Sequence, residues 1–105
     1  MNVVDSSGWI EYLSGGANAG YFREPIEDAA ALIVPSLSLF EVYRHLLRHA
    51  GRDEALQVVA ATRQATVVEL DDRLALAAAE LSVATRMVMA DSVMLATAQA
   101  FGATS

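Results

Sequence analysis

The stretch "NVVDSSGWIEYL" (residues 2–13) decides the fold prediction, because a short apolar run ends on a carboxylate and a helical pattern follows at once. Residues 3–4 predict a buried strand, and the apolar residues of 8–14 recur at helical spacing. A carboxylate at the end of a buried strand is costly unless something pairs with it. Asp5 is therefore either a turn or cap residue, or a charge that serves a function at the end of the strand.

The alternation of strand and helix patterns continues along the rest of the chain. Buried strands are predicted at 31–36 and 66–70, and helices at 8–14, 21–30, 36–51, 52–65, 72–85 and 91–102. The expected helix N-caps are Ser6 or Ser7, Asp53, Asp71 and Asp91. This order is typical of an α/β sandwich with a central parallel sheet, in which functional crevices lie beyond the carboxyl ends of the strands.

Composition limits the classes of function that the chain can perform. The 105 residues are 54% hydrophobic and carry a formal net charge of −6, with no cysteine and no lysine. Thiolate zinc sites, disulfides, Schiff-base lysines and Walker lysines are excluded. No apolar run reaches the roughly 20 residues that span a bilayer, and the N-terminus lacks a secretory pattern, so we expect a cytoplasmic protein. An acidic chain could bind nucleic acid only through a local contact.

Three acids follow predicted strands and are candidates for a shared site. Asp5 ends the first strand, Glu41 lies in the helix after the second, and Asp91 begins the last predicted helix. Each has a structural alternative: a turn or cap for Asp5, a capping box with Ser38 for Glu41, and an N-cap for Asp91. All three fall at the same end of the predicted sheet. Converging carboxylates need cations, and oxygen ligands without cysteine suit Mg²⁺ or Mn²⁺.

The helix predicted at 36–51 carries two more patterns. Glu41, His45 and His49 recur every four residues, a spacing that could hold zinc but is also that of an ordinary helix-surface pair.

Arginines and a hydroxyl beside the acids are candidate substrate contacts. Arg44, Arg48 and Arg52 form a stripe that is either a solvated face or a set of phosphate contacts at the mouth of the acidic cleft. Ser6, next to Asp5, could donate to a water or a phosphate, or could cap the helix that follows.

Three stretches in order carry a resemblance to a known family. "NVVDSSGWIEYL", "VPSLSLFEVYRHLLR" (residues 34–48) and "MADSVMLATAQAFGA" (residues 89–103) resemble the PIN-domain proteins, in particular the VapC-type toxins of bacterial toxin–antitoxin pairs. The resemblance identifies Asp5, Glu41 and Asp91 with the first three acids of that family, and Ser6 with its adjacent hydroxyl. It covers residues 1–105 as one PIN-like domain.

The resemblance implies a function, a cofactor and partners. It implies an α/β/α sandwich, usually a homodimer, that cleaves RNA with Mg²⁺ or Mn²⁺ as cofactor and is inhibited by a cognate antitoxin protein. The family continues into a further strand with a fourth acid, whereas this sequence ends at Ser105, so we expect a domain that is incomplete at its C-terminus. The alternative is a truncated or degenerate PIN module that dimerises and binds antitoxin without cleaving RNA.

Overall fold

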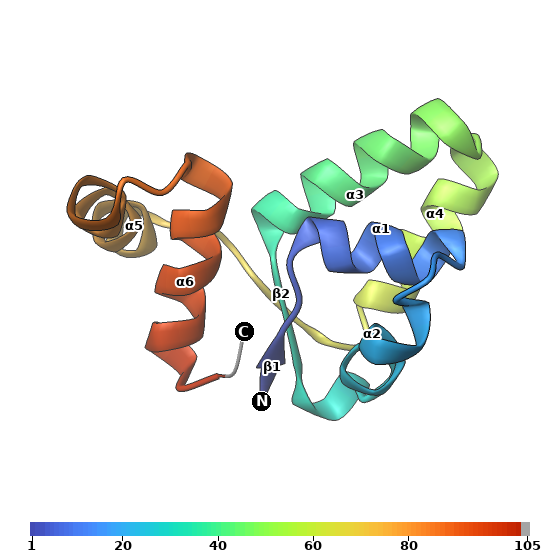
Figure 1. Ribbon diagram of the computed structural model, residues 1–105, viewed down its shortest axis with the longest axis horizontal. Coiled ribbons are helices and arrows are strands. Elements are labelled where there is room, and N and C mark those ends of the chain that lie inside the picture. The colour runs from blue at the N-terminus through green and yellow to red at the C-terminus, as the bar shows by residue number, and fades with distance from the viewer. Residues whose placement is uncertain (104–105) are drawn as a thin grey trace.

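The computed structural model of the chain describes residues 1–103 and places three parallel strands at their centre (Figure 1). The strands are β1 (Asn2–Val3), β2 (Leu32–Pro35) and β3 (Thr66–Val68), in the order β1-β2-β3. Val3 pairs with Ile33, and Val34 pairs with Val67. Parallel strands need crossover connections, and here each crossover is helical.

Helices cover both faces of this sheet (Figure 1). One face carries α1 (Ser6–Ser14), α2 (Ala19–Glu27), α3 (Ser36–His49) and α4 (Arg52–Thr62), and a 3₁₀ turn η1 (Ala29–Ala31) leads into β2. The other face carries α5 (Asp72–Thr85) and α6 (Met89–Phe101). We call these the α1–α4 layer and the α5–α6 layer. The predicted α/β/α sandwich with a central parallel sheet is confirmed.

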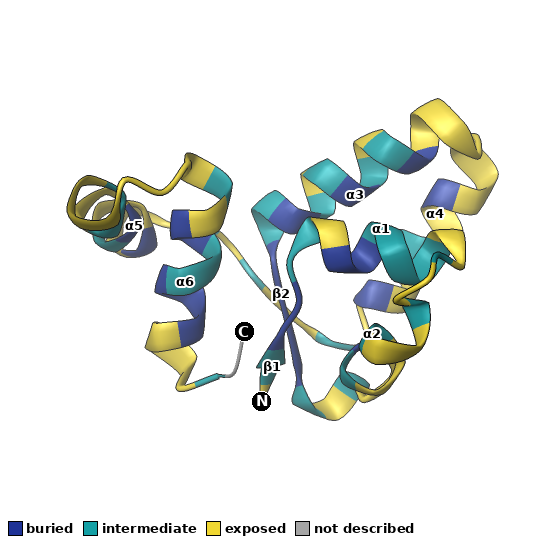
Figure 2. Ribbon diagram, in the orientation of Figure 1, coloured by how far each residue is buried: buried dark blue, intermediate teal, exposed yellow. Residues whose placement is uncertain are grey.

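The hydrophobic core is built around β2, because this strand lies between the two other strands and between the two helical layers (Figure 2). All four residues of β2 are buried, as a strand covered on both faces must be. On the α1–α4 side, Leu32 and Val34 join a cluster that includes Val4, Trp9 and Leu46. The α5–α6 layer has its own, smaller cluster, built around Leu74 and Val93 with two alanines.

Several helices begin at residues other than the predicted ones. Asp5, rather than Ser6 or Ser7, is the N-cap of α1, since its side chain accepts from the amide of Gly8. Gly51, rather than Asp53, holds the N-cap position of α4. The predicted cap at the start of α5 is confirmed: the carboxylate of Asp71 accepts from the amide of Leu74 at 2.9 Å.

Two structural alternatives for the acids are wrong. Helix α3 begins at Ser36, directly after the extended backbone of Pro35, so Ser38 is a buried residue inside the helix and forms no capping box with Glu41. Helix α6 begins at Met89, two residues before Asp91, which therefore lies in the first turn and is not the N-cap.

None of the helices within residues 1–103 is by itself long and apolar enough to cross a membrane. Helices α5 and α6, which pass that test only when they are joined, meet at a bend of 117°.

Candidate functional site

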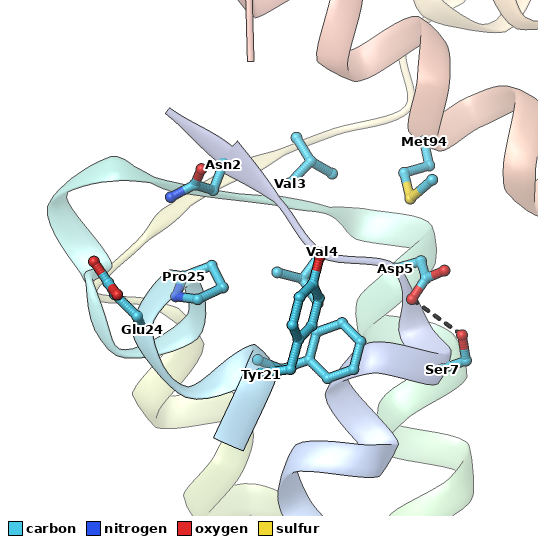
Figure 3. A pocket seen from close by; sticks show the side chains of 10 residues that line it. Asn2, Val3, Val4, Asp5, Ser7, Tyr21, Glu24, Pro25 and Met94 are labelled. Atoms are coloured by element: carbon cyan, nitrogen blue, oxygen red, sulfur yellow. Dashed lines mark hydrogen bonds between the residues drawn. The ribbon is translucent and has the colours of Figure 1, made fainter. Parts of the chain in front are cut away.

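Asp5 lies where β1 ends and α1 begins, and two donors fix its carboxylate. The amide of Gly8 donates to Oδ1 over 2.7 Å, and the hydroxyl of Ser7 donates to the same oxygen over 3.0 Å (Figure 3). Within the described contacts both donors bind Oδ1, which leaves Oδ2 as the oxygen for a ligand. The cap and the functional interpretation of Asp5 are therefore compatible.

The hydroxyl that contacts Asp5 belongs to Ser7. Ser6, the predicted substrate contact, is the first residue of α1 and is half-buried. Its contact with substrate stays a prediction.

Asp91 lies in the opposite helical layer from Asp5. Met94 of α6 lines the same hollow as Asp5 (Figure 3). Residues three apart share a helix face, so Asp91 lies on the face of Met94 and about one turn nearer the start of α6. Its side chain is exposed.

Glu41 lies on the side of α3 that turns toward α6. Leu37 in the first turn of α3 packs against the cluster of the α5–α6 layer. Glu41 follows four residues later on the same face and is half-buried. Asp5 caps α1, Asp91 lies in the first turn of α6 and Glu41 lies in the second turn of α3. Figure 1 shows that all three helices begin toward the end of the sheet at which β1 and β2 finish.

The three carboxylates are not drawn into a preformed metal cage. Within residues 1–103, no group of three or more histidine, aspartate or glutamate side chains is placed to hold a metal ion. The donor set itself suits a hard cation, since it consists of carboxylate oxygens only. Mg²⁺ usually keeps several waters and is bound through one or two carboxylates plus substrate phosphates.

The exposed face of α3 holds a separate, charged hollow of about 280 Å³. Its lining consists of Glu41, Arg44, His45, Arg48 and His49. The rings of His45 and His49 lie side by side with centroids 4.4 Å apart and planes tilted by 40°, which agrees with an ordinary helix-surface pair. They do not form a three-ligand zinc site with Glu41 in the described structure.

Arg52 does not continue the arginine stripe. Helix α3 ends at His49, and Gly51 turns the chain with a φ of 97° before Arg52 begins α4. Only Arg44 and Arg48 share the hollow on α3.

Sequence reasoning missed an aromatic pair beside Asp5. Tyr21 and Phe22 of α2 line the Asp5 hollow, and their rings meet edge to face with centroids 5.1 Å apart. The local pattern around residues 21–30 predicted only a short helix. The one feature of the sequence that could have indicated this contact is Gly8, because a glycine in the first turn of a helix leaves room for another side chain to pack closely against the backbone.

Helix α2 is held in place by a hydrogen bond to α1. The Tyr12 hydroxyl donates to Glu27 Oε2 over 2.5 Å. This hydrogen bond raises the pKa of Tyr12, because it stabilises the protonated phenol, and burial and the negative charge of Glu27 raise it further. The bond ties the helix that carries the aromatic pair to the helix that begins at Asp5.

Comparisons with known proteins agree with this architecture. The PIN domain family model matches residues 3–105. A toxin–antitoxin complex from Klebsiella pneumoniae has a similar fold, with a TM-score of 0.82 and 16% identity, over 98% of this chain and 82% of that one. VapC20 of Mycobacterium tuberculosis, described as a Sarcin-Ricin loop cleaving toxin, has a TM-score of 0.79 and 20% identity, over 98% and 85% of the two chains.

No curated protein matches the chain by sequence. The family match, which spans nearly the whole chain, and the fold shared with both structures show that this protein belongs to the PIN-domain family.

Proposed function

We propose that this protein is a metal-dependent endoribonuclease toxin that acts in the cytoplasm and is controlled by a cognate antitoxin. The observation that supports the proposal is the carboxylate of Asp5, which two donors fix at the point where β1 passes into α1. The proposal adds Glu41 of α3 and Asp91 in the first turn of α6 as partners of Asp5 in one site. The family supports this choice, as do the two similar structures, one a toxin–antitoxin complex and the other a Sarcin-Ricin loop cleaving toxin.

The acids have distinct roles in this proposal. Asp5 presents Oδ2 to Mg²⁺ or Mn²⁺, because its Oδ1 is already occupied by two donors. Asp91 and Glu41 complete the negative edge that attracts the ion, directly or through water. When it is bound, such an ion supplies an activated water and offsets the negative charge that builds up on the phosphate.

Substrate contacts come from neighbouring positions. Arg44 and Arg48 lie in the same hollow as Glu41 and are positioned to contact RNA phosphates next to the acidic edge. Ser6 adds a hydroxyl next to Asp5. Since the net charge is −6, this local arginine pair has to supply most of the attraction for RNA.

The partners of the proposed toxin are an antitoxin and a second copy of the chain. Large apolar side chains are exposed around the connection between α5 and α6, where Val83 is 84% and Val88 is 67% exposed. Exposed apolar side chains of this kind favour association in a homodimer or with the antitoxin.

A second candidate function is a PIN module that binds antitoxin without cleaving RNA. It is favoured by the lack of a preformed group of three metal ligands among the described residues. Metal-dependent cleavage by the purified chain decides between the two candidates.

The decisive experiment compares two N-cap aspartates. Asp5 and Asp71 each cap a helix through a carboxylate, and asparagine caps a helix about as well as aspartate. We expect Asp5→Asn to abolish Mn²⁺-dependent cleavage of single-stranded RNA while it leaves the unfolding temperature unchanged, and we expect Asp71→Asn to leave both unchanged. Cleavage that survives in Asp5→Asn, or persists with excess chelator, contradicts the proposal.

A further inference from the structure

A cavity of about 550 Å³ extends from Asp5 along α2 (Figure 3). This volume is within the range of about 300–1,000 Å³ that is typical of ligand pockets. Asp5 and Ser7 form an acidic end of this cavity, and Asn2 and Glu24 form a polar end far from it. Between the two ends, Tyr21 and Phe22 form an aromatic wall, and Val3 and Val4 form an apolar floor. Of the three acids of the proposed site only Asp5 lines this cavity, at one end, so the rest of the cavity needs an explanation of its own.

The aromatic wall is locked to the turn that fixes Asp5. A Cβ placed on Gly8 would lie 2.8 Å from Cε1 of Phe22 and 3.1 Å from Oδ1 of Asp5. The Phe22 ring therefore packs directly on the first turn of α1, at the residue whose amide donates to Asp5. A ligand that touches the aromatic wall is thereby held at a fixed position relative to the carboxylate.

Tyr21 forms the accessible part of the wall. Its side chain is 80% exposed, although its edge-to-face contact with Phe22 restrains the ring. In Figure 3 it stands between Asp5 on one side and Glu24 on the other. An exposed tyrosine with one supported edge offers a flat face to a planar ligand at low entropic cost, because it has only two side-chain torsions to fix.

The polar far end selects the kind of planar ligand. The carboxylate of Glu24 repels a phosphate but accepts hydrogen bonds from the amino and imino groups on the edge of a nucleobase, and the amide of Asn2 can both donate and accept. Single-stranded RNA is recognised through such stacking on aromatic rings combined with hydrogen bonds to the base edges.

We propose that Tyr21 is a stacking platform for the base of a nucleotide that flanks the phosphate at Asp5, with Glu24 as the residue that reads the edge of that base. The cavity is then a nucleobase subsite. It makes the enzyme prefer unpaired RNA, since a base inside a duplex cannot leave its stack to lie on Tyr21. This inference rests on the proposed function for the reaction at Asp5, but binding of the base does not require that reaction.

The test measures RNA binding without cleavage. The probe is a short single-stranded RNA, or the same strand with one abasic position, in EDTA, which removes the metal that the proposed cleavage requires. We expect Tyr21→Ala to weaken binding of the intact strand about tenfold, and Tyr21→Phe to bind like the wild type, because stacking on an aromatic ring typically contributes a factor of this size or more. Phe101→Ala removes another exposed aromatic ring, at the far end of α6, and serves as the matched control.

Two further results sharpen the assignment. The wild type should bind the intact strand better than the strand whose abasic position faces Tyr21, and Tyr21→Ala should bind both alike. Glu24→Gln should change the preference among the four bases, whereas the affinity averaged over the bases should change little.

The outcomes separate this inference from the proposed function. A wild type that cleaves RNA while Tyr21→Ala binds it equally well overturns the stacking platform alone. A wild type whose binding depends on Tyr21 but which never cleaves RNA overturns the proposed function alone. If the wild type binds none of the strands in EDTA, the stacking platform is wrong, and the cleavage assay with Mn²⁺ alone decides the proposed function.

Discussion

The two helical layers of this protein bury very different side chains against the same sheet (Figure 2). The α1–α4 layer has Trp9, Ile26 and Leu46 in its core, whereas the α5–α6 layer relies on Leu74, Val93 and buried alanines. The α5–α6 layer also leaves large apolar side chains exposed, with Leu76 and Met89 among them. Since burial of apolar area is the main driving force for folding, the α1–α4 layer holds most of the stability.

The proposed site lies across the boundary between these unequal layers. Asp5 and Glu41 belong to the well-packed layer, and Asp91 belongs to the thinly packed one. The position of Asp91 therefore depends on α6, whose contact surface is formed by small residues such as Ala96 and Ala98. Small changes in α6 packing should affect the site more than equal changes elsewhere.

The largest expected effect comes from removing one acid on each side of the boundary. Asp5→Asn and Asp91→Asn should each lower the rate of RNA cleavage by at least about 100-fold, as expected when charge stabilisation of the transition state is lost. If both acids serve one site, the double variant should lose little more than either single variant. Single-turnover cleavage measures all three rates. If the loss of rate in the double variant equals the product of the losses in the two single variants, Asp5 and Asp91 act independently and do not serve one site.

The same truncation in the two layers tests their unequal packing. Leu46→Ala should lower the free energy of unfolding by about 4 kcal/mol, because the large neighbouring side chains cannot collapse into the cavity. Leu74→Ala, next to alanines at the edge of its cluster, should cost about 2 kcal/mol. Urea denaturation followed by circular dichroism measures both. Equal losses would refute the comparison.

Enlarging one buried alanine in each layer separates stability from activity. Ala96→Leu in α6 and Ala55→Leu in α4 should each cost about 1–3 kcal/mol through overpacking. Only Ala96→Leu should also slow RNA cleavage, because it displaces the helix that carries Asp91. Cleavage is assayed well below the unfolding temperature of both variants. Equal slowing in the two variants would mean that α6 has no special role.

The smallest effect concerns the hydrogen bond between α1 and α2. The folded-state pKa of Tyr12 is raised above its ordinary value of 10.0, so the bond stabilises the fold below about pH 10 and its contribution is lost as the pH rises above that. Tyr12→Phe should lower the free energy of unfolding by about 1 kcal/mol at pH 7 and by less at pH 11. Urea titrations at both pH values test this, and a difference that grows with pH would contradict it.

The secondary structure could largely be predicted from the sequence, while several helix caps could not. Strong periodicity identified the elements, and Asp71 was recognisable as a cap because it precedes a long helical pattern. The start of α6 at Met89 was missed because Val88, an apolar residue, takes the N-cap position with extended backbone. The start of α3 at Ser36 was predicted, but the capping box at Ser38 was wrong, because the helix follows Pro35 directly and Ser38 lies inside it.

The sequence could predict where the acids lie in the topology, while their joint role in one site stays a prediction. The order of strands and helices predicted Asp5, Glu41 and Asp91 toward the carboxyl ends of the parallel strands. Phe22 packs on the Asp5 turn and Tyr21 packs on Phe22, which connects α2 to α1 through side chains, and no periodic pattern encodes such a contact.

Trp9 gives the chain a fluorescent probe that reports on one layer only. It is the single tryptophan of the sequence, it is buried in α1, and its indole N–H has no hydrogen-bond partner among the described residues. Its emission should therefore be blue-shifted in the native protein and should move to the red when the α1–α4 layer opens. A separation of α5 and α6 from the sheet should change the circular dichroism and leave the tryptophan emission unchanged. Circular dichroism and tryptophan fluorescence recorded on one sample can thus tell whether the α5–α6 layer unfolds first.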